Sequence, residues 1–350
     1  MLRCWGQKYL PRREHEDTNM PSKQKTIFSG MQATGALHIG NYLGALKNWV
    51  ELGAKYDCFY SVVDLHSITV RQEPEALRNR AREVLMLYMA AGLNAEKSCL
   101  YYQSHVSAHA ELSWILNCFC YMGELNRMHQ FKDKSTKNAA NINAGLYTYP
   151  VLQAADILLY QADGVPVGID QVQHLELSRD IAQRFNAIYG DVFTVPAPLL
   201  MKYGAKVMSL SDPGKKMSKS DENVNGCIFM LDERDTIIKK CKRAVTDSLA
   251  QVKYDSENQP GIANLIDIYR ACTEKTVAEI EKEFAGKGYG DFKMALGETI
   301  ADTLGPIQER FHALAADRAY VDGIIQNNAE KAAQVANETL NTVKKKVGFP

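Results

Sequence analysis

A short glycine-bearing stretch, Thr34-Gly35-Ala36-Leu37-His38-Ile39-Gly40-Asn41, places the tightest constraint on how this 350-residue chain folds. It follows a strand-like run over 25–29 and opens a helical pattern over 41–52. A strand, a glycine turn and a helix start form a place where a phosphate group binds. The glycines allow close backbone approach, and free N–H groups at a helix start attract anions. His38 and Asn41 are predicted to lie at the mouth of this site as side-chain donors.

Strand and helix patterns alternate along the first half of the chain. Buried strands are predicted over 56–63 and 98–102, with a strong helix over 74–91 between them. This alternation favours a parallel sheet with helices on its faces. Ligands of such sheets bind beyond the carboxyl ends of the strands, where Gln32–Asn41 and Asp64–His66 are expected to converge.

One later helix combines polar and apolar residues in an unusual way. It is predicted to open at Tyr149-Pro150 and to run to Tyr160, with one polar face formed by Tyr149, Gln153, Asp156 and Tyr160. A solvated face is one interpretation. Apolar residues cover much of the remaining surface, however, so we expect the helix to be buried nearly all round. A buried carboxylate needs a specific donor, which makes Asp156 a candidate ligand-reading residue.

A second strand–glycine–helix unit follows this helix. It consists of a short strand at 165–167, the turn Gly168-Ile169-Asp170-Gln171 and a long helix over 172–187. Asp170 either caps the helix or binds a ribose hydroxyl, and the residues alone favour the cap.

The segment 209–225 is predicted to be a mobile, exposed loop. It contains Pro213-Gly214 and several serines, and it lacks apolar periodicity. Its lysines Lys215, Lys216 and Lys219 are either a solvated charge run or a flexible cationic arm for a polyphosphate.

Two regions are predominantly helical. We interpret 105–146 as an insertion between two halves of the sheet, in which the aromatic and apolar run Glu111–Tyr121 is compatible with an interface. The region 226–350 shows no strand alternation and is predicted to be a second, helical domain. Its basic clusters, over 234–243 and 344–346, either compensate helix ends or contact the phosphate backbone of a nucleic acid.

Composition sets outer limits on function. The 41 basic and 41 acidic residues cancel, so a nucleic-acid partner has to be met by a local basic face. No apolar run approaches the membrane-spanning length. The eight cysteines form no C-x-x-C pair, so we expect no zinc or iron–sulfur site and reduced thiols in a cytoplasmic protein.

Residues 1–24 are expected to be a disordered extension, and translation could instead start at Met20. The alternative interpretation of this segment is a signal that directs the protein to an organelle.

Two motifs connect the chain to a known family. His38-Ile39-Gly40-Asn41 resembles the His-Ile-Gly-His signature of class I aminoacyl-tRNA synthetases, with Asn at its last position. Lys216-Met217-Ser218-Lys219-Ser220 matches the second signature of that family in full. The resemblance extends along nearly the whole chain from about Thr26, and segments such as 149–160 and 242–248 look like bacterial-type tryptophanyl-tRNA synthetases.

The resemblance implies a domain plan and a reaction. The plan is a Rossmann-like α/β catalytic domain over 25–208 with the insertion at about 105–146, the loop 209–225, and a helical anticodon-binding domain over 226–350. The reaction forms tryptophanyl-adenylate from L-tryptophan and ATP, releases pyrophosphate, and then transfers the tryptophanyl group to tRNA(Trp) with release of AMP. Mg²⁺ would be held mainly by ATP oxygens. The family forms a homodimer through the insertion.

The resemblance also implies roles for individual residues. Catalytic charge stabilisation falls to His38, Asn41, Lys134, Lys216 and Lys219. ATP binding falls to Gln32, Ala33, Thr34, Gly40, Asn41, Gly168, Ile169, Asp170, Val207, Lys216, Met217, Ser218, Lys219 and Ser220. Tryptophan binding falls to Phe28, Tyr149, Gln153, Asp156 and Gln171, with Asp156 accepting the indole N–H. His66 is either a packed strand-end residue or a site residue. Ala33, Gln153 and Ile169 depart from the commonest family pattern, where Pro, Met and Glu stand.

Three alternative functions compete with this one. Tyrosyl-tRNA synthetase shares the fold and both signatures, but Asp156 within Tyr-Pro-x-Leu-x-Ala-Ala-Asp fits the tryptophan pattern better. Nucleotidyltransferases use a related H-x-G-H motif, but they are usually shorter and lack the long helical domain. A catalytically silent tRNA-binding paralogue is disfavoured by the intact His38, Lys216, Lys219 and Asp156.

Overall fold

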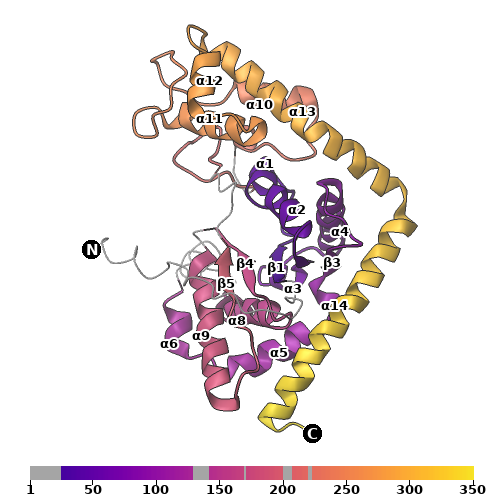
Figure 1. Ribbon diagram of the computed structural model, residues 1–350. Helices are drawn as coiled ribbons and strands as arrows, with labels where there is room; N and C mark the ends of the chain where they lie inside the picture. Colours follow the sequence, from indigo (N-terminus) through magenta and orange to yellow (C-terminus); the bar gives the residue numbers. More distant parts are fainter. Residues whose placement is uncertain (1–24, 129–141, 169–170, 200–206, 220–222) are drawn as a thin grey trace, which may run out of the picture.

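The computed structural model describes residues 25–128, 142–168, 171–199, 207–219 and 223–350. Figure 1 shows a central sheet between layers of helices, with two long C-terminal helices along one side of the molecule. The predicted extension over 1–24 lies outside the described residues. So do four of the predicted site residues, Lys134, Ile169, Asp170 and Ser220.

The sheet has five parallel strands in the order β3-β2-β1-β4-β5. The strands are β1 (Thr26–Met31), β2 (Asp57–Val62), β3 (Cys99–Tyr102), β4 (Gly164–Pro166) and β5 (Ala197–Leu199). This order is that of a Rossmann-like sheet, whose topological switch point lies between β1 and β4. The predicted α/β fold class is therefore confirmed. The sequence did not predict β5, because Pro198 within it and Pro196 just before it are typical of loops, although an edge strand tolerates proline.

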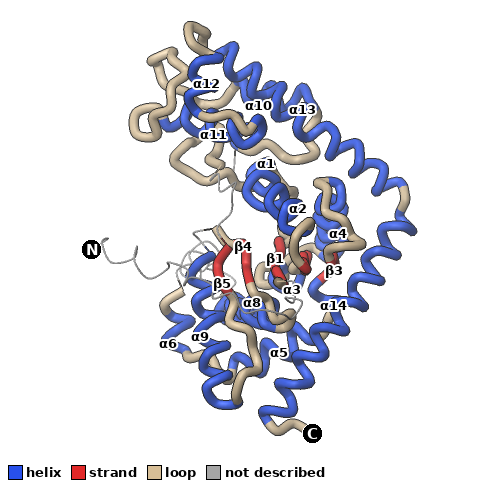
Figure 2. The backbone as a smooth tube through the Cα atoms, in the orientation of Figure 1, coloured by secondary structure: helices blue, strands red, loops and turns tan. Residues whose placement is uncertain are grey.

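Helices of the first two hundred residues cover both faces of the sheet (Figure 2). They are α1 (Ile39–Asn41), the π-helical turn Tyr42–Leu46, α2 (Lys47–Gly53), α3 (Asp64–Ser67), α4 (Pro74–Ala90), α5 (Ala108–Asn117), α6 (Met122–Asn126), α8 (Ala144–Leu158) and α9 (Val172–Tyr189). Successive strand residues face opposite sides of a sheet. Ile27 accordingly belongs to the core with α2 and α4, and Phe28 to the core with α5, α8 and α9.

Helix α8 corrects the predicted helix start. It begins at Ala144 rather than at Tyr149-Pro150, and Pro150 lies inside it. The side chain of Asn143 caps the helix by accepting the Leu146 N–H at 3.0 Å. A proline that sequence rules place at a helix start is tolerated here in the interior, so the proline rule misplaced the boundary.

The C-terminal region is helical, as predicted. Its helices are α10 (Arg234–Lys242), α11 (Pro260–Thr273), α12 (Val277–Glu283), α13 (Tyr289–Ala316) and α14 (Arg318–Val347). The core under α2 and α4 continues into α10–α13. None of the described helices combines the length and the apolar composition needed to cross a bilayer.

Helix α14 returns to the catalytic half and packs against β3 and α5 (Figure 1). Ala332 and Leu340 belong to the core that contains Phe28. At its end, Lys344 Nζ lies 2.6 Å from Glu111 Oε1, and Lys346 donates to the Tyr189 carbonyl at 3.0 Å. Two lysines of the predicted C-terminal basic cluster therefore contact the protein itself. The domain boundary near residue 226 stays a prediction.

Candidate active site

A cavity of about 450 Å³ lies at the carboxyl ends of β1 and β4, the switch point of the sheet. The five residues predicted to bind tryptophan all line it: Phe28, Tyr149, Gln153, Asp156 and Gln171. Gln32 and His66 line the same cavity, with Val165 and Val167 among the apolar residues. The structure thus brings residues from four separate segments to one place, and their binding roles stay predictions.

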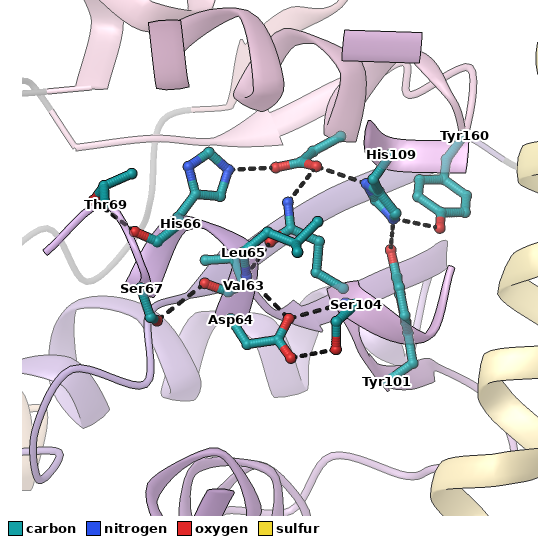
Figure 3. Close-up of polar contacts among 12 residues, drawn as sticks. Val63, Asp64, Leu65, His66, Ser67, Thr69, Tyr101, Ser104, His109 and Tyr160 are labelled. Carbon is teal, nitrogen blue, oxygen red and sulfur yellow. Dashed lines mark hydrogen bonds and ion pairs between the residues drawn. The ribbon is translucent and has the colours of Figure 1, made fainter. Parts of the chain in front are cut away.

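Asp156 is the buried carboxylate of this cavity, with 1% of its surface exposed. Its Oδ2 lies 2.8 Å from His66 Nε2, and its Oδ1 lies 2.6 Å from both His109 Nδ1 and Gln103 Nε2. The two histidines bind different oxygens of this carboxylate, and Figure 3 shows their rings well apart from each other. The alternative that this helix face is solvated is therefore wrong. His66 is both packed and part of the site, so the two interpretations of this residue were not exclusive.

The charge of Asp156 is set by its partners. Burial acts to raise its pKa, but the attraction of His109 and the hydrogen bonds from His109 and His66 outweigh burial and lower the pKa to about 2. The carboxylate is therefore ionised at neutral pH and acts only as a hydrogen-bond acceptor.

Tyr149 stands at the other polar wall of the cavity. Its hydroxyl lies 2.8 Å from His174 Nε2 on α9, and burial raises the pKa of the phenol. The hydroxyl therefore stays protonated at neutral pH and is positioned by α9, the helix that follows β4.

The His38 turn is built differently from the prediction. His38 occupies the N-cap of the three-residue helix α1, its Nδ1 accepts the Gly40 N–H at 3.1 Å, and its own N–H donates to Asn41 Oδ1 at 3.0 Å. The Gly40 N–H is thus bound within the turn, so the prediction of free N–H groups at this helix start is wrong for Gly40. A Cβ atom on Gly40 would lie 2.9 Å from the His38 ring, which explains the need for glycine.

The second signature lies against the first. Gly35 has a φ of +148°, and a Cβ atom on it would lie 2.6 Å from Cδ of Lys219. The aliphatic part of the Lys219 side chain therefore packs directly against Gly35. An antiparallel bridge between Met208 and Lys216 holds the base of the loop, where the Met217 N–H donates to the Val207 carbonyl at 3.0 Å. Met217 is only 2% exposed, so the prediction of an exposed loop is wrong for this residue, which packs in the core with Val207.

Cations gather where the two signatures meet. Burial, followed by the charges of Lys219 and Lys216, lowers the pKa of His38 to about 4. Burial, followed by the charge of Arg80 on α4, lowers the pKa of Lys219 to about 8. At neutral pH His38 is neutral, and since its Nδ1 accepts the Gly40 N–H, its proton lies on Nε2. The arrangement suits a polyanion, which would relieve the repulsion between the cations.

Other predicted nucleotide-binding residues lie in neighbouring segments of the chain. Ala33 is buried and donates its N–H to Ser67 Oγ at 3.1 Å, Gly168 accepts the Gln171 N–H at 2.9 Å, and Thr34 and Ser218 are half-buried. Gln171, not Asp170, stands at the N-cap position of α9, although its side chain makes no capping hydrogen bond. Asp170 itself lies outside the described residues.

Sequence reasoning missed His109 and Gln103. Both are fully buried, although His109 stands in the segment 105–146 predicted to be a polar insertion and Gln103 stands between that segment and the strand predicted over 98–102. The only sequence signal was the alternation of polar and small residues over 103–110, which does not identify a partner for Asp156. Among the residues that the structure describes, no three His, Cys, Asp or Glu side chains gather as metal ligands.

Large apolar side chains are exposed at the α5–α6 corner. Trp114 is 72% exposed, Tyr121 62% and Met122 66%. The Arg184 guanidinium lies over the Tyr121 ring at 4.3 Å from the ring centroid. This apolar corner lies in the predicted insertion and has the composition of a protein–protein interface.

Comparisons with known proteins agree on one family. Residues 20–305 match the family described as tRNA synthetases class I (W and Y). The chain is 54% identical over 331 residues to a Tryptophan–tRNA ligase of Clostridium tetani, covering 95% of this chain and 98% of that protein.

Solved structures give the same result. The chain resembles tryptophanyl-tRNA synthetase of Mycoplasma pneumoniae with a TM-score of 0.86 and 36% identity, covering 93% of this chain and 98% of that one. It also resembles the Campylobacter jejuni enzyme complexed with ADP and tryptophan, with a TM-score of 0.79, 34% identity, and coverage of 93% and 100%.

Proposed function

The chain belongs to the class I tRNA synthetases of the tryptophan and tyrosine group, and we propose that it attaches L-tryptophan to tRNA(Trp) with ATP. This is the activity for which its 54% identical relative is named. The observation that carries the proposal is the cavity at the switch point. It combines a buried, ionised Asp156 with all the other residues predicted to hold tryptophan.

The first step needs position and charge rather than a protein nucleophile. The tryptophan carboxylate attacks the α-phosphorus of ATP, forming tryptophanyl-adenylate and releasing pyrophosphate. Lys216 and Lys219, with the Nε2–H of His38, stabilise the charge that develops on the phosphates. The ATP oxygens would carry Mg²⁺ as part of the substrate, and the ion would supply further charge stabilisation.

Further residues, within and outside the two signatures, complete the proposed nucleotide site. Gln32 and Thr34 steady the triphosphate, while Val207 and Met217 contact adenine. Lys134, Ile169, Asp170 and Ser220 keep the roles implied by the family resemblance, although they lie outside the described residues.

Selection of the amino acid rests on one polar atom. Indole carries a single N–H donor, and Asp156 accepts it. Phe28 and the apolar wall surround the ring, while Tyr149, Gln153 and Gln171 hold the α-ammonium end. Phenylalanine leaves the acceptor position that the indole N–H would fill without a donor, which is worth up to about 10⁴-fold in discrimination.

The second step needs contact with tRNA. Lys239, Lys242 and Arg243 on and after α10 are exposed, which suits contacts with the phosphate backbone. Lys240 and Arg234 of the same cluster instead pair with Asp232 and Asp302. We therefore assign tRNA binding to part of the predicted basic cluster and structural roles to the rest.

We further propose a homodimer that works in the cytoplasm. The apolar corner of Trp114, Tyr121 and Met122 supplies a surface that a second copy of the chain would cover. The seven described cysteines are free thiols, as suits a reducing compartment.

The deciding experiment is ATP–pyrophosphate exchange driven by each amino acid separately. Tryptophan should drive exchange in the wild type, and Asp156→Ala should reduce it strongly. Exchange with tyrosine alone would contradict the proposal and favour the tyrosine enzyme. Absence of exchange with retained tRNA binding would favour a silent paralogue.

A further inference from the structure

The acceptor sites of Asp156 are nearly all occupied. An ionised carboxylate offers about four lone-pair positions. Two positions on Oδ1 are taken by His109 Nδ1 and Gln103 Nε2, each at 2.6 Å, and one on Oδ2 by His66 Nε2 at 2.8 Å. A single position remains for the indole N–H, on Oδ2. Recognition therefore depends on how the carboxylate is rotated, and the partners of Oδ1 fix that rotation.

Both partners are held in place: Gln103 Oε1 accepts the Leu65 N–H at 3.1 Å, and His109 is held by two tyrosine hydroxyls. His109 is fully buried, and its Nδ1–H must donate to Asp156 because an ionised carboxylate only accepts. Its other nitrogen, Nε2, lies 3.0 Å from the Tyr160 hydroxyl and 3.2 Å from the Tyr101 hydroxyl. Burial raises the pKa of both phenols well above 10, so both hydroxyls keep their protons. Figure 3 shows Tyr101 and Tyr160 beside His109, away from His66.

The sheet itself fixes the position of Tyr160. Its ring stacks on Phe59 at 4.4 Å and on Phe28 at 5.6 Å, with interplanar angles of 22° and 4°. Phe28 and Phe59 are register partners on β1 and β2. Tyr160 therefore lies across two paired strands, and its hydroxyl is a rigid anchor for the imidazole. His66 lines the cavity but His109 does not, so His109 reaches the amino acid only through Asp156.

We propose that His109, anchored by the hydroxyls of Tyr101 and Tyr160, is a positioning residue that rotates Asp156 so that Oδ2 accepts the indole N–H. The inference rests on the proposed function, since it concerns how that site selects tryptophan. It assigns specificity to a residue of the helical insertion that does not touch the substrate.

The test compares tryptophan with its benzothiophene analogue, in which sulfur replaces the N–H. Both are measured by amino-acid-dependent ATP–pyrophosphate exchange, as the ratio of their kcat/KM values. His109→Phe removes the donor to Asp156 and should reduce this ratio about 10- to 100-fold, the range for a hydrogen bond to a charged group. The KM for ATP should stay within about twofold of the wild type.

Three further variants separate positioning from folding. His109→Asn keeps a donor near the place of Nδ1 and should recover most of the ratio. The double variant Tyr101→Phe/Tyr160→Phe keeps the rings but removes the anchor, and should lower the ratio even if His109→Phe does not fold. His105→Phe, an exposed histidine of the same segment, is the matched control and should leave the ratio unchanged.

The outcomes distinguish the inference from the function on which it rests. If the wild type shows no tryptophan-dependent exchange, the proposed function fails. If the wild type is active and His109→Phe lowers both substrates equally, His109 is merely structural and the inference is overturned. An unchanged ratio in both His109→Phe and the double tyrosine variant overturns it as well.

Discussion

The buried ion pair of Lys240 offers a direct test of how the helical region supports the nucleotide site. Lys240 Nζ on α10 lies 2.6 Å from Asp232 Oδ2, and the two side chains are only 8% and 15% exposed. The ammonium also lies 4.9 Å from the centroid of the Phe229 ring. We predict that Lys240→Met destabilises the protein strongly, because it leaves a largely buried carboxylate without its cation.

The magnitude follows from burial. Removing one partner of a buried pair costs about 3–5 kcal/mol, whereas an exposed pair contributes about 0–1 kcal/mol. Arg234 on the same helix supplies the matched control, since it pairs with Asp302 and the two side chains are 55% and 69% exposed. We therefore expect Lys240→Met to cost about 3 kcal/mol and Arg234→Met no more than about 1 kcal/mol.

The effect should reach the active site. Asp232 Oδ2 also accepts the Phe229 N–H at 2.8 Å. The neighbouring residues pair with the His38 turn, since Ile39 donates to the Ile228 carbonyl and Met230 to the Leu37 carbonyl, both at 2.9 Å. Loosening Asp232 therefore loosens the turn that carries His38, and the KM for ATP in the exchange reaction should rise.

Urea unfolding, monitored by circular dichroism, measures the free energy of unfolding. The midpoints of the variants are compared where the slopes of the transitions are equal. The double variant Lys240→Met/Asp232→Asn removes both charges but keeps an acceptor for the Phe229 N–H. It should recover most of the lost stability. Equal losses in Lys240→Met and Arg234→Met, or no recovery in the double variant, would refute the reasoning.

Three further predictions follow from the site. The kcat/KM for ATP should fall as the pH rises through about 8, because Lys219 of the free enzyme then loses its proton. Lys219→Arg should abolish this decrease, since arginine stays protonated. A decrease that persists in Lys219→Arg would exclude Lys219 as the titrating residue. The pKa of Asp156 is lowered from 3.8 to about 2, so its ionised form should contribute about 2 kcal/mol to the free energy of unfolding above pH 4. This contribution should be lost as the pH falls through 2. Unfolding of Asp156→Asn, measured over the same pH range, should not show this decrease in stability. Trp114→Glu should convert the proposed dimer into monomers, as measured by sedimentation equilibrium. The control Tyr320→Glu changes a tyrosine on α14 that is 55% exposed, and it should leave the dimer intact. A wild type that is already monomeric would contradict the proposed dimer.

Local patterns predicted the fold class and the buried carboxylate of the cavity, whereas the other residues assigned to tryptophan came from the family resemblance. The apolar runs that became β1, β2 and β3 are buried strands, and local periodicity suffices to identify such runs. The argument that a carboxylate on an apolar helix needs a partner led from sequence alone to Asp156. Its burial at 1% exposure confirms the physical premise.

Features that depend on long-range contacts were not predictable in the same way. His109 and Gln103 stand 47 and 53 residues from Asp156. The packing of α5 against α8 brings His109 to Asp156, and the turn that follows β3 brings Gln103 to it. Strand β5 lies at the sheet edge, where pairing with β4 matters more than its unfavourable proline, Pro198. In each case tertiary contacts override or complete a signal that is ambiguous over a short window.

The nucleotide site is assembled from both halves of the chain, which limits how far the catalytic domain can be considered alone. His38 forms a β-bridge with Phe229, and Asn264 on α11 bonds both the N–H and the carbonyl of Met208, at 2.8 and 3.0 Å. The helical region therefore holds both the first signature and the base of the loop that carries Lys216 and Lys219. The His38–Phe229 contact is a backbone bridge, whereas Asn264 acts through its side-chain amide, so a shift of the helical region would move the two signatures together. Under the proposed assignment of tRNA binding to that region, a shift caused by tRNA would therefore change the geometry in which ATP is activated.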